Sequence, residues 1–542
     1  MSEVRGQLER AESRFPAPDR VMDRLLDRRD RRRRNRRIIS AVVALLIAAA
    51  AVGGLLSTFR GTGERRPASH QGSITPGTVG DLRPAWIGVT PHTVGSDQGV
   101  ALPPVVAGNS VYVDSKGFFV YTFSTTCASG GKLCEPEWIS SGRLHGAGAA
   151  GNDNGISGRV VWPVAATDGH VYQSAVDDAV LAYPSSCGTS AANCHPVWAG
   201  EFSGVPSSPA VSDGVVYVVS GGTLSAFPTS CPPNGRTYPP LWTGPTPQLG
   251  SQQPSHVAVA DGVVYVTSGR GVYAFSTNCG RSSCAPIWHA ELSSGVAPSE
   301  PVVGGGEVFV AGSSREGSSV VAYPTSCRGT CQPSWTWLRQ GGSGRSSAPV
   351  YADGAVYVTE ATSQGKTQLL GFRSSCRTDG RTCAPEWTGS GTGEPIVSGG
   401  MVYVASGGAG DAALAYRAGC GTEGSTCAPA RAYEGAAGQP VVSGGVLYGV
   451  NGDRVVAFDL SCRQASCRPI WSSSVQGVIR SGPIVTDDAV YVGTSEGDLV
   501  AFKRTRSAGG GSGATAAVVV ALLAVAVLVG AVVVRRRRVD FH

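Results

Sequence analysis

The sequence lacks the motifs by which common hydrolases and metalloproteases are identified. It has no His-Glu-x-x-His pair, and no Gly-x-Ser-x-Gly elbow in a strand-turn-helix context. Glycine runs such as residues 304–306 lie between strand-like segments, and no helix follows them to hold a phosphate. We therefore expect no catalytic centre, no metal site and no bound cofactor. Five histidines fall in loops or at repeat positions, which is typical of surface residues: His145, His170, His195, His256 and His289.

A charge excess is also missing from the central part of the chain. Residues 1–37 carry 13 Arg and 7 acidic residues, and residues 535–542 carry four Arg and one Asp. The remainder carries 28 basic and 31 acidic residues, so it has no electrostatic footprint for nucleic acid. The basic ends are suited to anionic lipid. In the first of them, a short helix with Met22 and Leu25 on one side would lie on lipid or dock a cytoplasmic partner.

Two uncharged apolar runs, residues 38–59 and 514–534, are each long enough to cross a bilayer as a helix. An arginine cluster precedes the first run and another follows the second run, so each lies towards an end of the chain. Because arginine clusters resist translocation, they predict cytoplasmic tails at 1–37 and 535–542. Residues 60–81 and 504–513 are then linkers, and residues 82–503 form an extracytoplasmic domain. We expect a two-pass protein of the cell membrane. Cleavage of the first run as a signal peptide, or removal of the C-terminal run as a sorting tail, stays open.

All 15 cysteines lie between the two apolar runs. Outside the membrane, cysteines with regular spacing indicate disulfides. Seven pairs recur along the chain, each with its two cysteines four to seven positions apart: Cys127/Cys134, Cys187/Cys194, Cys279/Cys284, Cys327/Cys331, Cys376/Cys383, Cys420/Cys427 and Cys462/Cys467.

Cys231 is the odd cysteine. In each complete unit the second cysteine stands four residues before a tryptophan position, and in this unit Tyr238 stands there, four residues before Trp242. We expect Cys231 to be an accessible free thiol that could join two molecules as a disulfide dimer, and a buried inert residue is the alternative.

One repeat unit recurs about every 45 residues. Its second strand carries an aromatic residue after a Gly-Asn, Asp-Gly, Gly-Gly or Asp-Asp turn, which favours tight hairpins. Four short strands per unit predict an all-β propeller, with eight or nine four-stranded blades. The nine aromatic positions are Tyr112, Tyr172, Tyr217, Tyr265, Phe309, Tyr357, Tyr403, Tyr448 and Tyr491.

A tryptophan follows each cysteine loop, except that Arg431 takes this place in one unit. Trp86 precedes the first unit, whereas the last unit, residues 483–502, has no tryptophan strand of its own. We therefore expect the strand around Trp86 to complete the last blade, which closes the ring and brings the two chain ends together. The regular spacing predicts that these tryptophans pack between blades rather than hold a cofactor.

Over residues 82–503 the strand-turn-Val-Tyr-Val, Ala-Phe and Trp series resembles the pyrroloquinoline-quinone (PQQ)-binding-like propeller repeat of bacterial membrane proteins. More distantly it is similar to the propeller lipoprotein of outer-membrane assembly. The resemblance implies the fold and does not imply the cofactor. Quinoprotein dehydrogenases of this superfamily use adjacent cysteines, calcium ligands and a catalytic Asp, and this chain has no adjacent cysteines. Its best calcium-like stretch, Asn152 to Gly155, is more typical of a turn.

These observations favour a non-enzymatic binding or scaffold module outside the membrane, or a sensor that signals inward through its two helices. Its partners would be membrane lipids, contacted through both helices and the arginine flanks, and an extracytoplasmic protein or glycan. A PQQ-dependent oxidoreductase and an envelope-assembly factor are the alternatives.

Overall fold

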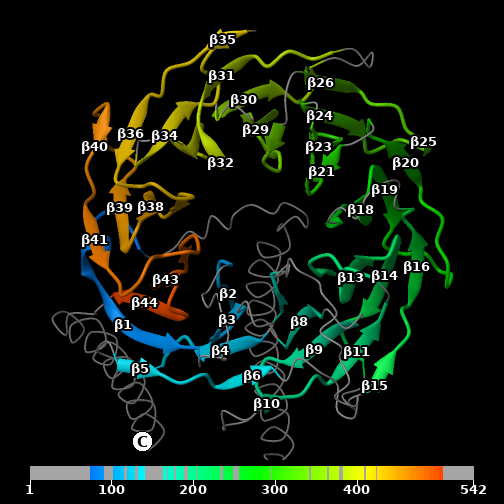
Figure 1. Cartoon of the computed structure of the whole chain (residues 1–542), viewed down its shortest axis with the longest axis horizontal. Helices are drawn as coiled ribbons and strands as arrows, with labels where there is room; N and C mark the ends of the chain where they lie inside the picture. Colours follow the sequence, from blue (N-terminus) through cyan, green and yellow to red (C-terminus); the bar gives the residue numbers. More distant parts are fainter. Residues whose placement is uncertain are drawn as a thin grey trace, which may run out of the picture. The chain divides into compact units, whose positions relative to one another are not determined.

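The computed structural model describes residues 74–504 with short gaps, the longest of which cover 91–101 and 141–162. These residues belong to one compact unit, Gly63–His542, and the other unit, Met1–Thr62, lies outside the described part of the chain. Nine sheets are arranged as blades around a ring (Figure 1). The predicted all-β propeller is confirmed, and the number of blades is nine. Within each blade we name the strands a to d from the centre of the ring outwards.

Blades 1 to 3 each contain four antiparallel strands in chain order. Their bounds are β2 (Val105–Ala107), β3 (Ser110–Asp114), β4 (Val120–Ser124) and β6 (Trp138–Ser140); β7 (Ala165–Ala166), β8 (His170–Ala175), β9 (Ala179–Pro184) and β11 (Trp198–Glu201); and β12 (Ala210–Ser212), β13 (Val215–Ser220), β14 (Thr223–Pro228) and β16 (Trp242–Pro245).

Blades 4 to 6 follow the same plan, with one additional short strand in blades 5 and 6. Their bounds are β17 (His256–Ala260), β18 (Val263–Ser268), β19 (Gly271–Ser276) and β20 (Trp288–Glu291); β21 (Ala297–Pro298), β22 (Val302–Gly304), β23 (Glu307–Ser313), β24 (Gly317–Pro324) and β26 (Trp335–Gln340); and β27 (Gly344–Ser346), β28 (Val350–Ala352), β29 (Ala355–Thr362), β30 (Thr367–Arg373) and β31 (Trp387–Ser390).

Blades 7 to 9 complete the ring. Their bounds are β32 (Thr392–Ser398), β33 (Met401–Ala405), β34 (Ala412–Arg417) and β36 (Arg431–Glu434); β37 (Val441–Ser443), β38 (Val446–Asn451), β39 (Arg454–Asp459) and β41 (Trp471–Ser474); and β42 (Ile484–Val485), β43 (Ala489–Gly493), β44 (Asp498–Arg504) and β1 (Leu82–Val89). A short 3-10 helix, η1 (Val79–Asp81), precedes β1.

The ring closes as the position of Trp86 predicts. Strand β1, from the beginning of the domain, pairs antiparallel with β44 at its end, and Trp86 lies opposite Ala501. The N-terminal strand is therefore strand d of blade 9, and the closed ring leaves no open edge between the first and last blades.

The hairpin turns between strands a and b also follow the sequence. Asp213, Asp261 and Asp353 have positive φ angles of 48 to 50°, and each is followed by a glycine with positive φ. Two successive residues of this kind are the requirement of a type I′ turn, whose twist matches that of the flanking strands.

Each tryptophan of the series packs at the joint between two blades. Trp242, for example, lies 6.0 Å from Tyr217 of its own blade and 6.3 Å from Phe275 of the next, measured between ring centroids. Where Arg431 replaces tryptophan, Tyr433 fills the joint and stacks edge-on against Phe458 at 5.4 Å. The tryptophans are therefore core residues, as predicted.

Among the described residues, no helix has the length and apolar character needed to cross a bilayer. Both predicted membrane segments, residues 38–59 and 514–534, lie outside the described part of the chain.

Candidate binding faces of the propeller

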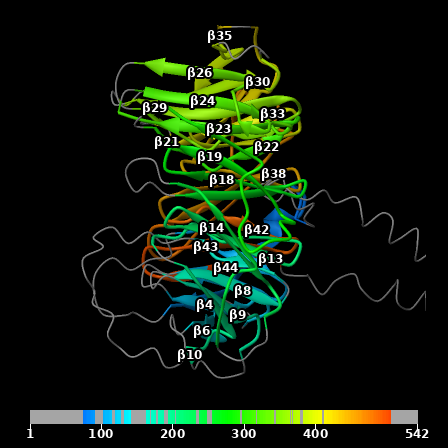
Figure 2. The same cartoon turned by 90° about the vertical axis from the view of Figure 1, so that its right-hand side faces the viewer.

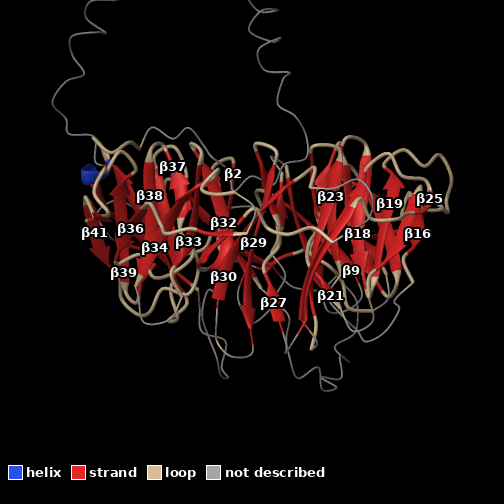
Figure 3. Cartoon of the chain, turned by 90° about the horizontal axis from the view of Figure 1, so that it is seen from above, coloured by secondary structure: helices blue, strands red, loops and turns tan. Residues whose placement is uncertain are grey.

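The two flat sides of the ring carry different kinds of connection. The a–b turns and the c–d loops lie on one side, together with Leu82 at the start of β1 and its pairing partner Arg504 at the end of β44. We call this side the terminal face, because both ends of the described chain leave the domain there. The opposite side, the hairpin face, carries the b–c hairpins and the connections between blades (Figure 3).

Blades 5 and 6 project from the hairpin face (Figures 2 and 3). Strands β24 and β29 are eight residues long, whereas β13 and β14 of blade 3 have six. The additional length is paired, because β24 continues its ladder with β26 as far as Gly317 opposite Gln340. The projection is therefore ordered sheet rather than loop. We call it the lip.

An ion pair between a buried carboxylate and a half-buried arginine joins the lip across the joint between blades 5 and 6. Glu360 on β29 is 1% exposed and pairs with the guanidinium of Arg339 on β26. Gln368 Nε2 donates a second hydrogen bond to Glu360 Oε1 at 3.1 Å. A carboxylate this deeply buried requires such partners, since an unpaired buried charge costs several kcal/mol, roughly 3–5 when one partner is removed. The Arg339–Glu360 pair therefore fixes blades 5 and 6, which form the lip, relative to each other.

The hairpin face exposes both apolar and acidic side chains. Leu338 on the lip is 49% exposed, and Val205 and Val478, in connections between blades, are 46% and 44% exposed. Acidic residues outnumber basic ones among the described side chains that topology places here, apart from the buried Asp114 and Glu360. The acidic residues are Glu201, Glu291, Glu300, Glu394, Asp411, Glu434, Asp453, Glu496 and Asp498, and the basic ones are Arg270, Arg315, Arg339, Arg345, Arg454 and Arg480.

On the terminal face, each cysteine loop reaches over the joint to the preceding blade. Six loops add a short parallel strand to strand d of that blade, and two more make an isolated parallel bridge to it. These additional strands form the outer circumference of the ring (Figure 1). They are β5 (Lys132–Cys134), β10 (Asn193–Cys194), β15 (Arg236–Tyr238), β25 (Gly329–Thr330), β35 (Ser425–Thr426) and β40 (Ser466–Cys467).

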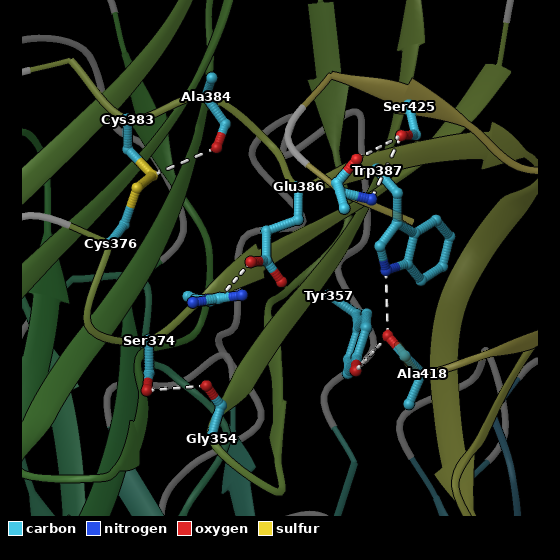
Figure 4. A network of polar contacts seen from close by, with 12 residues as sticks. Gly354, Tyr357, Ser374, Cys376, Cys383, Ala384, Glu386, Trp387, Ala418 and Ser425 are labelled. Carbon is cyan, nitrogen blue, oxygen red and sulfur yellow. Dashed lines mark hydrogen bonds and ion pairs between the residues drawn. A yellow bond between two sulfur atoms is a disulfide. The ribbon is translucent and has the colours of Figure 1, made fainter. Parts of the chain in front are cut away.

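Figure 4 shows the joint between blades 6 and 7, where contacts run in both directions. From blade 6, Trp387 Nε1 donates a hydrogen bond to the carbonyl of Ala418 in blade 7 at 3.0 Å. From the loop of blade 7, the Ser425 amide donates to the carbonyl of Glu386 at 3.3 Å. Arg373 forms an ion pair with the side chain of Glu386 in blade 6. Because the loop and the tryptophan secure the joint from opposite sides, the cysteine loops act as clasps between blades.

Disulfides close seven of these eight loops, and all seven predicted pairs are present. The second cysteine also contributes to the joint. Its amide donates a 2.7 Å hydrogen bond to the preceding blade in four cases: Cys284 to Thr243, Cys331 to His289, Cys383 to Thr336 and Cys427 to Thr388. This use of the loops across joints is not evident from the cysteine spacing alone.

Cys231 is free, but the expected accessibility is wrong. Its residue is 8% exposed and packs with Trp198 and Phe227 at the joint between blades 2 and 3. The Cys231 thiol donates to the carbonyl of Pro228 at 3.7 Å, and burial raises the pKa of the thiol above its usual value. First cysteines such as Cys127 stay half-buried near the surface, whereas Cys231 has turned into the core. A thiol in this position does not support the expected disulfide dimer.

The other residues singled out in the sequence are not brought together. His170 and His195 belong to blade 2, whereas His256 and His289 belong to blade 4. Burial lowers the pKa of His170. His145 and the stretch Asn152 to Gly155 lie outside the described residues. Within the described residues, no three His, Cys, Asp or Glu side chains form a group that could hold a metal ion.

A family model described as outer membrane protein assembly factor BamB, with the repeat name PQQ_2, matches residues 146–375, 239–462 and 347–508. These overlapping matches together cover more than half of the chain. The chain belongs to this family. The BamB-type PQQ repeat therefore corresponds to the blade of this propeller, and the resemblance found in the sequence is confirmed. Comparison with curated proteins gave no match.

Several solved propellers are similar to this chain at low sequence identity. BamB from Moraxella catarrhalis is 16% identical, with 64% of this chain and 96% of that chain covered and a TM-score of 0.40. The quinohemoprotein alcohol dehydrogenase from Comamonas testosteroni is 13% identical, with 82% and 79% covered and a TM-score of 0.43. The computationally designed Ika8 protein is 11% identical, with 63% and 95% covered and a TM-score of 0.42.

Proposed function

We propose that this chain is a membrane-anchored, extracytoplasmic propeller of the BamB-type family that binds an envelope protein on its hairpin face, as a scaffold rather than as an enzyme. The pairing of Leu82 with Arg504 carries the proposal. It places both ends of the domain on the terminal face, so segments 38–59 and 514–534 would enter the membrane from that side. The hairpin face is then turned away from the membrane and is open to a partner.

The chemistry of the hairpin face indicates what kind of partner fits. The lip offers the exposed Leu338 on a rigid platform that the Arg339–Glu360 pair locks. The surrounding acidic excess favours a partner with a basic surface, because complementary charge steers association and excludes like-charged proteins. A preformed platform also lowers the cost of ordering the interface on binding.

A role as a PQQ enzyme is less well supported by the described residues. The tryptophans of the series are stacked inside the joints, as Trp242 is between Tyr217 and Phe275, so their faces are not offered to a planar quinone. The disulfides join cysteines four to seven positions apart in the sequence, and none joins adjacent residues. The described donor set therefore does not fit the arrangement of the quinoprotein dehydrogenases. Inward signalling through the two membrane segments remains a variant of the scaffold role.

Site-specific photo-crosslinking in intact cells tests the proposal. A photoreactive residue at position 338, on the lip, should yield a discrete protein adduct, and one at position 281, on the terminal face, should not yield the same adduct. Protease applied to cells stripped of wall should digest the propeller and spare both arginine-flanked ends. Protection of the propeller, or the same adduct from both positions, would contradict the proposal. Turnover of an alcohol by purified chain with added PQQ and calcium would favour the enzyme instead.

A further inference from the structure

We propose that the outer edge of strand β26, on the lip, binds an extended segment of the partner protein as an added β-strand. In this mode of binding, main-chain hydrogen bonds join the two proteins, and the side chains beside the edge select the sequence that binds. The inference rests on the proposed function, because it takes the lip as the binding site. It adds the conformation in which the partner is bound.

Alternate residues of β26 direct their main-chain groups away from blade 5. The carbonyl of Thr336 accepts a 2.7 Å hydrogen bond from the amide of Cys383, in the loop of blade 6. Thr336 also forms an isolated parallel bridge with Thr382 of that loop. The main chain of Thr336 therefore faces outwards. Because the pattern along a strand repeats every two residues, the amides and carbonyls of Leu338 and Gln340 face the same way.

The described part of the chain does not cover this end of the edge. The loop of blade 6 returns after Cys383 to its own strand β31, whereas β26 continues to Gln340 in its ladder with β24. Strand β26 has six residues, and the strands d of blades 3, 4 and 6 have four each. Both Leu338 and Gln340 are exposed. An exposed strand edge of this kind is a ready template for pairing with another chain.

The other blades carry residues that discourage such pairing at the position of Leu338, three residues after the tryptophan position. Natural sheets protect their edges with charged side chains and with proline, which has no amide hydrogen. Seven other blades have a described residue at this position: Glu201, Pro245, Glu291, Ser390, Glu434 and Ser474, which are exposed, and Val89, which is half-buried. An exposed leucine in this place leaves the edge of the lip without that protection.

The side chains of β26 show which contact an added strand would meet. Trp337 faces blade 6, where its ring centroid lies 5.8 Å from that of Phe372, and Arg339 on the same side pairs with Glu360. Leu338, between Trp337 and Arg339, therefore points to the opposite side of the sheet. Its side chain is 49% exposed. A partner segment with an apolar residue next to Leu338 would bury this surface.

The proposed contact continues an interface that the ring already uses. At six joints a short parallel strand from the following blade lies along strand d, and at Thr336 the bridge to Thr382 takes its place. A partner strand at residues 338–340 would extend the same edge beyond that bridge. The Arg339–Glu360 pair holds the edge in place, so binding does not have to order it.

The register of the bound segment tests the inference in intact cells. A short diazirine side chain is placed at position 338 or at position 340 of the full chain, and mass spectrometry identifies the residue that it crosslinks. Because paired strands keep one register, the residues crosslinked from the two positions should lie two residues apart in one segment of the partner. Crosslinks scattered over several segments, to a glycan or to a second copy of this chain would overturn the inference.

Two variants at position 340 isolate the main-chain bond. Gln340→Pro removes the amide hydrogen, whereas Gln340→Ala removes the same side chain and keeps that hydrogen. The diazirine at position 338 reports the yield of adduct, under conditions in which the yield follows occupancy. The proline variant should give about fivefold less adduct than the alanine variant, because it lacks one main-chain hydrogen bond. Equal yields from the two variants would count against strand addition.

A second pair of variants tests the unprotected edge. Leu338→Glu gives blade 5 the residue that three other blades carry, and it should lower the adduct yield from position 340 by roughly tenfold, because the charge would lose water beside an added strand. Leu241→Glu makes the same change at a leucine that is 51% exposed on the terminal face, and it should leave the yield unchanged. Equal effects of the two variants would refute the inference.

The outcomes separate this inference from the proposed function. The absence of any protein adduct from position 338 would refute binding at the lip itself. A protein adduct from position 338 without the two-residue register would refute strand addition alone. Melting temperatures equal to that of the unsubstituted chain exclude misfolding as the cause of a lowered yield.

Discussion

Trp471 Nε1 donates a hydrogen bond to the carbonyl of Leu82 at 3.2 Å, across the joint between blades 8 and 9. At the other eight joints a cysteine loop of the following blade crosses to the preceding one. Blade 9 has no cysteine loop. Residues Ile74, Val79 and Leu82, each 1% exposed, pack into the same core cluster as Trp471 instead. The N-terminal segment is thus the clasp of the ninth joint.

The first prediction follows from this clasp. Replacing Ile74 with Ala should destabilise the joint by about 2–4 kcal/mol, the usual cost of removing a buried isoleucine side chain. Hydrogen exchange should quicken in β41 and β44 more than in blades 3 to 5. Val478→Ala, which shortens an exposed apolar side chain, is the control and should change little. Uniform exchange throughout the ring in Ile74→Ala would show that the segment is no local clasp.

The second prediction concerns a disulfide clasp. Removing the bridge with Cys376→Ala and Cys383→Ala should cost about 2 kcal/mol, because the closed loop is short. The loss should appear at the joint between blades 5 and 6, where the Cys383 amide donates to Thr336 at 2.7 Å. The measurements are amide hydrogen exchange at position 383, which should become faster, and the melting temperature, which should fall. Far-ultraviolet circular dichroism should keep its β signal, and an unchanged melting curve would refute the role of the bridge.

The repeat explains why the fold could be predicted and the clasps could not. The aromatic, turn and tryptophan positions recur in register, so strands, closure by Trp86 and disulfide pairs followed from one alignment of the chain with itself. The destination of each loop depends on the neighbouring blade, and only the three-dimensional ring brings Lys132 opposite Trp86. In several units a glycine two positions after the tryptophan, such as Gly200 after Trp198, is a sequence signal for the joint. At Gly200 an added Cβ would lie 2.4 Å from the ring of Phe227, so this pattern marks where the next blade packs.

The candidate binding faces could be predicted from the sequence to a smaller extent than the fold. The lip arises from a few more residues in β24 and β29, and the partner of Glu360 comes from a different blade. Cys231 shows the same limit, because its position in the loop pattern predicted a free thiol correctly but could not tell which way the side chain turns.

The third prediction is that Cys231 is unreactive in the folded protein. It is buried, and its raised pKa lowers the thiolate fraction that reacts with alkylating reagents. Iodoacetamide should label one cysteine per chain after denaturation without reductant, and almost none before it. Non-reducing electrophoresis should show no dimer that depends on Cys231, so wild type and Cys231→Ala should give the same bands. Rapid native labelling at Cys231 would contradict the burial.

The last prediction concerns Asp114, the final residue of β3, which is 7% exposed. The corresponding residues of three other blades donate a hydroxyl hydrogen bond to a carbonyl of the next blade: Ser174 to Ser207, Thr267 to Ser299 and Thr359 to Gly393. Asp114 carries a carboxyl group where those residues carry a hydroxyl. Burial raises the pKa of this carboxyl group well above its usual value. A protonated Asp114 can donate as the hydroxyl residues do, whereas its ionised form leaves a buried charge.

The sign of the pH dependence follows from this raised pKa. The unfolded chain loses the Asp114 proton near pH 4, whereas the folded protein keeps it to higher pH, so the unfolded state binds fewer protons in between. Stability is therefore complete below the unfolded pKa and declines as the pH rises towards the folded pKa. Asp114→Asn keeps a donor without the charge, so it should raise the melting temperature at neutral pH and flatten its decline above pH 4. Asp213→Asn, in an exposed turn, serves as the control and should leave the profile unchanged. Identical pH profiles for wild type and Asp114→Asn would mean that Asp114 is ionised in the folded propeller.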